Sequence, residues 1–204
     1  MPKLDVPPTK SSLLVLQHSL EFAEEGFDLL EQKRQILVLE LMRRVEVDRR
    51  IQDEVDAVMG AALEAVREAA LRSGTEALAR ESLGIRRQHQ VDVQSRSVMG
   101  IDIPTITVHH EAAKPEFGVA GGSALSDEVM RRFSEALDAI ARLAEVENSV
   151  TRLASEVRRT QRRVNALEKI FIPEYRQTIG YIEDVLEERE REQFVIMKMA
   201  KRHL

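Results

Sequence analysis

The chain has 204 residues, of which 32% are charged and only 4% are aromatic, with no tryptophan and no cysteine. This balance is typical of long helices and coiled coils, and hydrophobic residues at 43% argue against disorder. The missing cysteines exclude disulfides, thiolate metal sites and cysteine nucleophiles, and the net charge of −5 disfavours a nucleic-acid binder.

Neither a membrane span nor a secretory leader is predicted. No apolar run reaches the ~20 residues that a bilayer-spanning helix needs, and residues 1–8 lack the apolar stretch of a signal peptide. We therefore expect a cytosolic protein, held at a membrane only through another protein if it works there.

A long helix is predicted over residues 10–72. Candidate N-caps are Thr9, Ser11 and Ser12. Apolar residues then recur in steps of three and four, interrupted only at Arg34, Arg44 and Asp48. They are Leu13, Leu16, Leu20, Ala23, Phe27, Leu30, Leu37, Leu41, Ile51, Val55, Val58, Ala62, Ala65 and Ala69. Such a 3.5-residue repeat winds a helix around a partner in a left-handed supercoil. Ser73-Gly74 is its first plausible end.

A middle insert is predicted over residues 75–124. It opens with a short helix near residues 76–83, after which the apolar period changes to two, at Val91, Val93, Ile101, Ile103, Ile106 and Val108. This period predicts a β-hairpin with its turn at Met99-Gly100 and with Pro104 on an edge strand or a bulge. Residues 114–123 read as loop. We expect the hairpin at the end of the coil away from both termini, carrying partner contacts.

A second long helix is predicted over residues 126–201, with Ser126 as N-cap. Its apolar series is Phe133, Leu137, Ile140, Leu143, Val146, Val150, Leu153, Val157, Val164, Leu167, Phe171, Tyr175, Ile179, Ile182, Leu186 and Ile196. The spacing slips to four and four near Tyr175, a stutter that locally unwinds a supercoil. The slip coincides with Pro173, which is expected to kink the helix.

The two helices predict a mainly α fold, a long antiparallel two-helix coiled coil with a small mixed insert that contains the hairpin. A parallel homodimer is the alternative. If Leu13 packs near Ala200, residue numbers of facing partners total about 213. That register places Arg158–Arg163 opposite the acidic residues near Asp48–Asp56, and it carries Asp127–Ala139 past the end of the first helix.

No catalytic, cofactor-binding or metal-ligating residue is predicted. The run His109-His110-Glu111, with His89 upstream, reads as surface histidines because adjacent strand residues point to opposite faces. Gly118–Gly122 lacks the Lys-Ser/Thr of a phosphate-binding loop. The carboxylates of Glu187–Glu192 read as solvated helix charges. Arg158, Arg159, Arg162 and Arg163 could grip a phosphate backbone, but the acidic total charge favours a solvated or internally paired face.

Several stretches in all three segments carry a family resemblance, in the same order along the chain. They are Pro8-Thr9-Lys10, Leu29-Leu30 with Lys33-Arg34, Ser97-Val98-Met99-Gly100 with Ile103-Pro104, Arg158 through Glu168 with Ile172-Pro173, and Leu186 through Glu192 with Phe194 and Lys198. Together they resemble the D subunit of the archaeal/vacuolar-type rotary ATPases.

The resemblance implies a non-catalytic central rotor subunit without a cofactor, on the cytoplasmic side of a membrane. Its implied partners are the catalytic and non-catalytic subunits of a hexameric head, a small globular central-stalk subunit and a funnel-shaped subunit on the membrane ring. Two interpretations from other classes stay open at this point. One is a coiled-coil adaptor or export chaperone, and the other is a membrane-surface helical protein, which should show a basic face with exposed aromatics.

Overall fold

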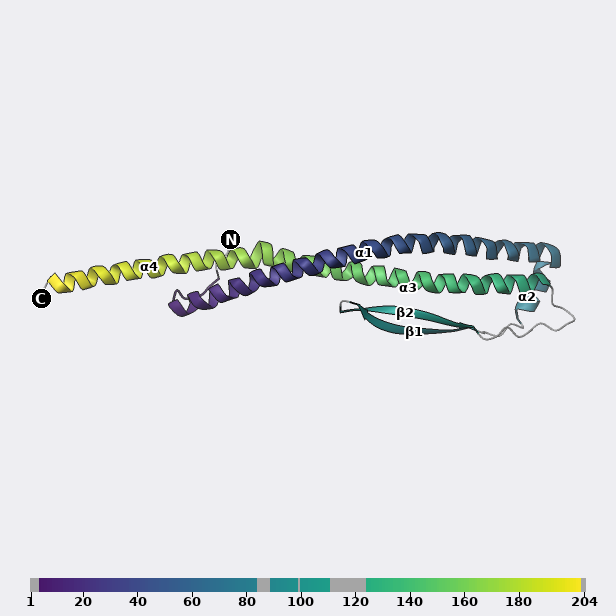
Figure 1. The fold of residues 1–204 in the computed structure, drawn as a ribbon, viewed down its shortest axis with the longest axis horizontal. Coiled ribbons are helices and arrows are strands. Elements are labelled where there is room, and N and C mark those ends of the chain that lie inside the picture. The colour runs from purple at the N-terminus through teal and green to yellow at the C-terminus, as the bar shows by residue number, and fades with distance from the viewer. Residues whose placement is uncertain (1–3, 84–88, 99, 111–123, 203–204) are drawn as a thin grey trace. The chain divides into compact units, whose positions relative to one another are not determined.

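The computed structural model describes residues 4–83, 89–98, 100–110 and 124–202. Its elements (Figure 1) are α1 (Lys10–Ser73), α2 (Thr75–Ser82), β1 (His89–Val98), β2 (Ile101–His110), α3 (Ala124–Ala166), the π-helical turn η1 (Leu167–Phe171) and α4 (Ile172–Arg202). The predicted fold class, two long terminal helices with a β-hairpin between them, is confirmed. None of the helices in the described ranges is long and apolar enough to cross a membrane.

The chain divides into two compact units. The terminal unit comprises residues 1–38 and 157–204, and the central unit comprises residues 39–156.

The start of α1, in the terminal unit, is fixed by a side-chain cap. The backbone N–H of Ser12 donates to Thr9 Oγ1 over 3.1 Å. The helix begins at Lys10, directly after Thr9. A hydroxyl at this position satisfies a backbone donor that has no partner inside the helix. Of the three candidate caps, Thr9 is the one that the structure uses.

Three cross-helix contacts set the register of the terminal unit. Lys10 pairs with Glu190 at 2.7 Å. Gln17 donates to Glu183 over 3.3 Å, and Arg176 donates to Glu24 over 2.6 Å. The numbers rise along α1 as they fall along α4, so the helices are antiparallel, and each pair of numbers totals 200.

The predicted register, with a total of about 213, is therefore wrong by 13 residues. It assumed that α1 and α4 end at the same level, whereas α4 continues for twelve residues past Glu190, to Arg202, as Figure 1 shows. The correction removes the predicted acidic partners of Arg158–Arg163.

One apolar cluster in the core of the terminal unit consists of Leu16, Ile179 and Ile182, against which Tyr175 and Leu186 pack. The segment that precedes α1 also joins this core.

Leu4 and Val6, in that preceding segment, pack against the cluster. The backbone N–H of Leu4 donates to Thr178 Oγ1 over 3.3 Å, and Arg189 donates to the carbonyl of Pro8 over 3.0 Å. The chain before α1 therefore runs along α4 and covers the seam.

The predicted stutter is a π-helical turn. The N–H of Ile172 donates to the carbonyl of Leu167, five residues back, and Pro173 has no N–H with which to bond the carbonyl four residues before it. The extra residue turns Phe171 outward, to 46% exposure, so its predicted place in the seam is wrong. Val164 and Ile179, on either side of η1, remain buried.

In the central unit, short side chains form the contact between α1 and α3. Alanines are buried on both helices, at Ala62, Ala69, Ala136 and Ala139, and such small residues let helix axes approach closely. Arg142 pairs with Glu54 at 2.6 Å, and Val66 and Ala70 of α1 lie near Val129 and Met130 of α3, so these helices are also antiparallel. α3 is therefore paired with α1 over Asp127–Ala139, and the predicted overhang of this stretch is wrong.

The end of α1 is as predicted, whereas the start of α3 is not. α1 ends at Ser73, and Gly74 follows with φ +84°, a conformation that favours glycine. Ser126 lies inside α3 instead of capping it. It is buried, and its hydroxyl donates to Glu81, so Ser126 connects α3 to the segment that contains α2.

The hairpin is regular. Its antiparallel register runs without interruption from Val98 opposite Ile101 to His89 opposite His110, which excludes a bulge at Pro104. Gly100 has φ +76°, which suits the predicted two-residue turn.

The position of the hairpin corrects another prediction. The N–H of Ile106 donates to Glu145 over 3.0 Å, and Arg152 donates to the carbonyl of Asp102 over 2.5 Å. The hairpin thus lies beside α3 at Glu145–Arg152, roughly 30 Å or more along the helix from its start. The backbone groups of Asp102 and Ile106 that contact α3 lie on the edge of β2 that does not pair with β1. In a strand the backbone groups of alternate residues point to the same edge, so those of Pro104 lie there too. The missing N–H of Pro104 therefore removes no hydrogen bond between the strands.

Candidate interaction surfaces

The histidines near the end of the hairpin do not form a metal site in the described ranges. His109 lies 3.2 Å from Asp92 on the facing strand, and no group of three or more His, Asp or Glu residues there could hold an ion. The side chains of His89 and His110, as well as Glu111 and Gly118–Ser123, lie outside what the structure describes.

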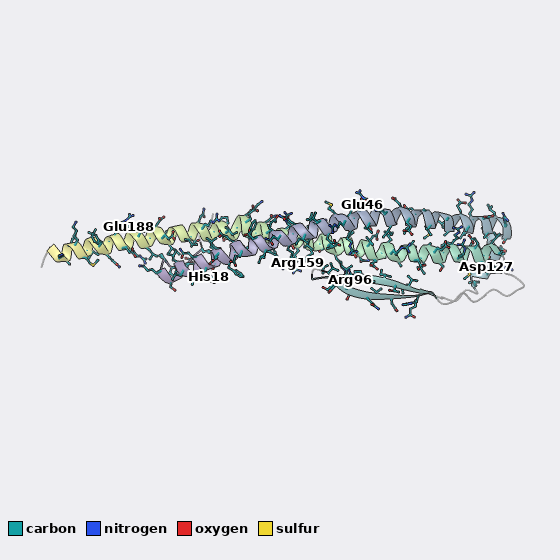
Figure 2. All side chains as sticks on the ribbon, in the orientation of Figure 1. His18, Glu46, Arg96, Asp127, Arg159 and Glu188 are labelled. Carbon is teal, nitrogen blue, oxygen red and sulfur yellow. The ribbon has the colours of Figure 1, made fainter. Side chains whose placement is uncertain are left out.

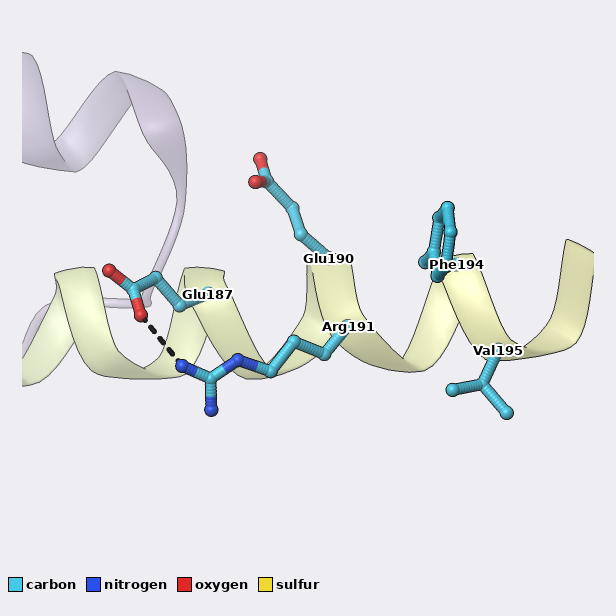
Figure 3. Close-up of a pocket in the computed structure, with 5 residues that line it drawn as sticks. All are labelled: Glu187, Glu190, Arg191, Phe194 and Val195. Atoms are coloured by element: carbon cyan, nitrogen blue, oxygen red, sulfur yellow. Dashed lines mark hydrogen bonds and ion pairs between the residues drawn. The ribbon is translucent and has the colours of Figure 1, made fainter. Parts of the chain in front are cut away.

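Three carboxylates of the stretch Glu187–Glu192 pair with cations, those of Glu187, Glu188 and Glu190. Arg191 lies 3.1 Å from Glu187 and 3.5 Å from Glu188, as Figure 3 shows for Glu187. The bond from Lys10 lowers the pKa of Glu190 and raises that of Lys10. Glu187, Glu188 and Glu190 thus belong to a salt-bridged surface.

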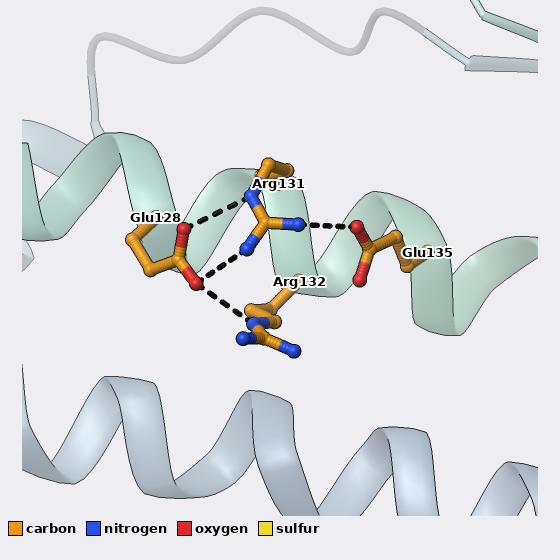
Figure 4. Close-up of polar contacts among 4 residues, drawn as sticks. All are labelled: Glu128, Arg131, Arg132 and Glu135. Atoms are coloured by element: carbon orange, nitrogen blue, oxygen red, sulfur yellow. Dashed lines mark hydrogen bonds and ion pairs between the residues drawn. The ribbon is translucent and has the colours of Figure 1, made fainter.

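A second charged network occupies the first turns of α3 (Figure 4). Glu128 accepts hydrogen bonds from Arg131 at 2.6 Å and from Arg132 at 2.8 Å, and Arg131 also pairs with Glu135 at 2.5 Å. The guanidinium of Arg131, and then that of Arg132, lowers the pKa of Glu128 to about 2. Because Glu128 is also near the positive end of the helix dipole, this network favours the start of α3.

The four arginines singled out from the sequence, Arg158, Arg159, Arg162 and Arg163, are exposed on α3 in the terminal unit, where Figure 2 labels Arg159. No guanidinium among them pairs with another described residue. Ten of the other described arginines pair with carboxylates, namely Arg34, Arg44, Arg50, Arg67, Arg72, Arg131, Arg132, Arg142, Arg176 and Arg191. Of the two structural interpretations, a solvated face fits and an internally paired face does not. The cluster is positive charge available to an acidic surface.

The last three turns of α4, residues 191–202, have no neighbour in the described chain. They carry exposed large apolar side chains, Phe194, Val195, Ile196, Met197 and Met199. Successive residues turn by about 100°, so these side chains cover all sides of the helix, and Figure 3 shows Phe194 and Val195 pointing in different directions. Ile196 was predicted in the seam and is instead exposed, because α1 does not reach it.

A line of exposed residues on α1 in the terminal unit was not predicted from the sequence. Its members, which we call the outer stripe, are Val15, Phe22, Leu29 and Ile36. Each comes one residue before a member of the inner seam, Leu16, Ala23, Leu30 and Leu37. A second series of apolar residues seven apart, displaced by one residue from the seam series, is the sequence signal that could have revealed the stripe.

Comparison with known proteins identifies the family of this chain. The family model of the ATP synthase D subunit matches residues 12–202. The chain belongs to the ATP synthase D-subunit family. The D subunit of the A-type ATP synthase of Methanopyrus kandleri is 40% identical over 199 residues, covering 97% of this chain and 86% of its relative. The D subunit of the V-type ATP synthase of Thermotoga neapolitana is 35% identical, covering 97% and 98%.

A further relative, the D subunit of the A-type ATP synthase of Pyrococcus furiosus, is 37% identical over 97% of this chain and 94% of its own length. Membership of the D-subunit family makes this chain a subunit of an A/V-type rotary ATPase, a complex of ATP synthesis and ion transport. It confirms the resemblance drawn from the sequence and leaves no support for an unrelated coiled-coil adaptor.

Proposed function

We propose that this subunit is the central shaft of its rotary ATPase and transmits torque between the ion-translocating membrane sector and the catalytic head. The observation that carries the proposal is the end of α4. Residues 191–202 expose Phe194, Val195, Ile196, Met197 and Met199 on different sides of the helix, among charged residues such as Lys198. An enclosure by other subunits would cover these apolar side chains. The central cavity of a ring of subunits offers such an enclosure, so the terminal unit enters the head.

The paired helices suit a shaft in two ways. Two packed helices resist bending and twisting more than one does, and the buried seam at Leu16 and Ile182 keeps them together. α1 and α4 differ in sequence, so the terminal unit presents a different face in each direction. Three catalytic sites around an asymmetric shaft are then held in three different states.

The chain has no catalytic residues of its own in this proposal, and hydrolysis belongs to the head. Its partners are the catalytic and non-catalytic head subunits, the small globular central-stalk subunit and the funnel-shaped subunit on the membrane ring. The complex holds it at the cytoplasmic side of the membrane. The four unpaired arginines supply positive charge for an acidic partner surface.

Rotation tests the proposal directly. The head is immobilised, and a bead is attached through Ser97→Cys, an exposed hairpin position in a chain without cysteine. With ATP supplied, the bead should turn in steps of a third of a revolution. A bead that stays still on a head that hydrolyses ATP would refute the shaft.

A further inference from the structure

The seam between α1 and α3 has a weak level in the central unit, which we call the charged break. It lies between Leu41 and Ile51 of α1, where Arg44 and Asp48 stand at positions that the apolar series would give to aliphatic residues. Charged residues at seam positions lower the stability of a helix pair. The guanidinium of Arg44 lies 3.1 Å from Glu40 of the same helix, so this ion pair does not join α1 to α3.

Asp48 is the most unfavourable residue of the charged break. Its side chain is partly buried, and its Oδ1 is enclosed without a hydrogen-bond partner among the described residues. A carboxylate oxygen that loses its water and gains no donor destabilises the contact to which it belongs. At Asp48, α1 therefore offers α3 neither an apolar side chain nor a paired polar one.

The hairpin binds α3 at this same level. The residues of α3 that bind it are Glu145 and Arg152. The cross-helix pair of Arg142 with Glu54 has residue numbers that total 196. In an antiparallel pair this total holds along the seam, so Glu145 and Arg152 lie about opposite the two ends of residues 44–51. The hairpin therefore spans the charged break.

The hairpin also packs α3 where α1 does not. Ile101 and Ile103 of β2 are 9% and 5% exposed, although a two-stranded hairpin has no second layer of its own to cover its side chains. Ser149 of α3, between the two hairpin-binding residues, is fully buried. Its hydroxyl donates to the carbonyl of Glu145 over 2.7 Å and so stays within its own helix. At this level β2 supplies α3 with apolar packing that the charged break cannot give.

We propose that the hairpin is a detachable splint for the charged break. Docked on α3, it supports the helix pair at a level where the seam alone is weak. Its hold is limited, because Arg152 is exposed and Val91 and Val93 of β1 face solvent, at 49% and 65% exposure. When the hairpin undocks, water reaches Asp48, and α1 and α3 separate locally. The splint belongs to the fold of the central unit and does not depend on the shaft.

Hydrogen–deuterium exchange of the full chain, measured by mass spectrometry, tests the splint. Ile103→Asp places a charge on the buried side of the hairpin and should undock it. Val93→Asp is the matched control, because it places the same charge at an exposed position of the same hairpin. We expect Ile103→Asp to speed exchange roughly tenfold or more in residues 44–51 and 145–152, with Ala62–Ala69 unchanged. Val93→Asp should exchange like the wild type.

A repair variant tests the cause. Asp48→Leu gives the charged break an apolar side chain, so it should restore slow exchange in both stretches even when Ile103→Asp is present. The splint is overturned if Ile103→Asp leaves exchange in residues 44–51 and 145–152 unchanged, or speeds it equally along all of α1 and α3. It is also overturned if Asp48→Leu does not restore slow exchange, since the break is then not what the hairpin supports.

Arg152→Ala is the milder undocking variant. It removes the hydrogen bond to the carbonyl of Asp102 without burying a charge, and it should speed exchange in the same two stretches by a smaller factor. It decides the question if circular dichroism shows that Ile103→Asp does not fold. Wild-type exchange in Arg152→Ala would then overturn the splint.

Discussion

Lys10 Nζ lies 2.7 Å from Glu190 Oε1. Lys10 is the first residue of α1, and Glu190 lies past the middle of α4. This pair lies at the level where the two-helix part of the terminal unit ends. Both side chains are exposed, so the ion pair itself adds little stability. Its significance is geometric, because it shows which part of α4 has a partner helix and which part is left for another subunit.

The register leads to a cross-linking prediction. In a chain without native cysteine, Gln17→Cys with Glu183→Cys should react within one chain with a short bis-maleimide, since these side chains touch at 3.3 Å. Leu20→Cys with Gln193→Cys should not, because Gln193 lies beyond the start of α1. Gel mobility under denaturing conditions separates looped monomers from dimers. Efficient looping of the second pair would restore the register inferred from the chain ends.

Stability should distinguish the paired and unpaired parts of α4. Ile182→Ala removes a fully buried side chain from the seam and should lower the free energy of unfolding by about 2–4 kcal/mol. Ile196→Ala, at a position 65% exposed, should change it by less than about 0.5 kcal/mol. Urea unfolding followed by circular dichroism measures both. A large loss from Ile196→Ala would mean that residues 191–202 pack on their own chain.

Periodicity was enough to predict the helices and the hairpin, because steps of 3.5 and 2 residues are properties of local sequence. The family was inferred instead from the resemblance of short sequence stretches in all three segments. Periodicity did not predict the register, since Leu13 fits the pattern against Ala200 as well as against Leu186, two heptads earlier, which packs on the same cluster as Leu13. The contacts that settle it, such as Lys10 with Glu190, join residues far apart in the chain. The exposure of Phe171 was also missed, because a stutter has the same spacing whether the helix unwinds evenly or forms one wide turn.

Acid should weaken the network at the start of α3. The pKa of Glu128 is lowered from 4.5 to about 2 by Arg131 and Arg132, so its ion pairs stabilise the fold above about pH 4.5 and this contribution is lost as the pH falls toward 2. Glu128→Gln should therefore be less stable than the wild type at pH 7 and equal to it near pH 2. Thermal unfolding at both values, with Glu147→Gln as an exposed control, measures the difference. A gap that persists near pH 2 would point to packing instead of charge.

The isolated chain should neither bind nor hydrolyse ATP. Gly118–Gly122 lacks the Lys-Ser/Thr of a phosphate-binding loop, and the acids of Glu187–Glu190 are held by Lys10 and Arg191. Calorimetric titration of the chain alone should give no heat of binding, and a phosphate-release assay should give only the buffer rate. Micromolar binding would contradict the expectation that nucleotide sites belong to the head.

The π-helical turn should tolerate the loss of one residue where a regular helix does not. η1 holds one residue more than an α-helical turn, so deleting Lys169 together with Pro173→Ala should let the helix close normally and keep Ile179 and Ile182 in the seam. Deleting Arg176 from α4, with the same Pro173→Ala, rotates everything after it by about 100° and takes both isoleucines out of the seam. The second variant should lose roughly 3 kcal/mol or more, from two buried side chains, while the first keeps the unfolding free energy of Pro173→Ala alone. Chemical unfolding of the three variants measures this. If both deletions lower the unfolding free energy equally, the π-helical turn Leu167–Phe171 does not contain a residue that the helix can lose without a change of register. The outward position of Phe171 would then have another cause.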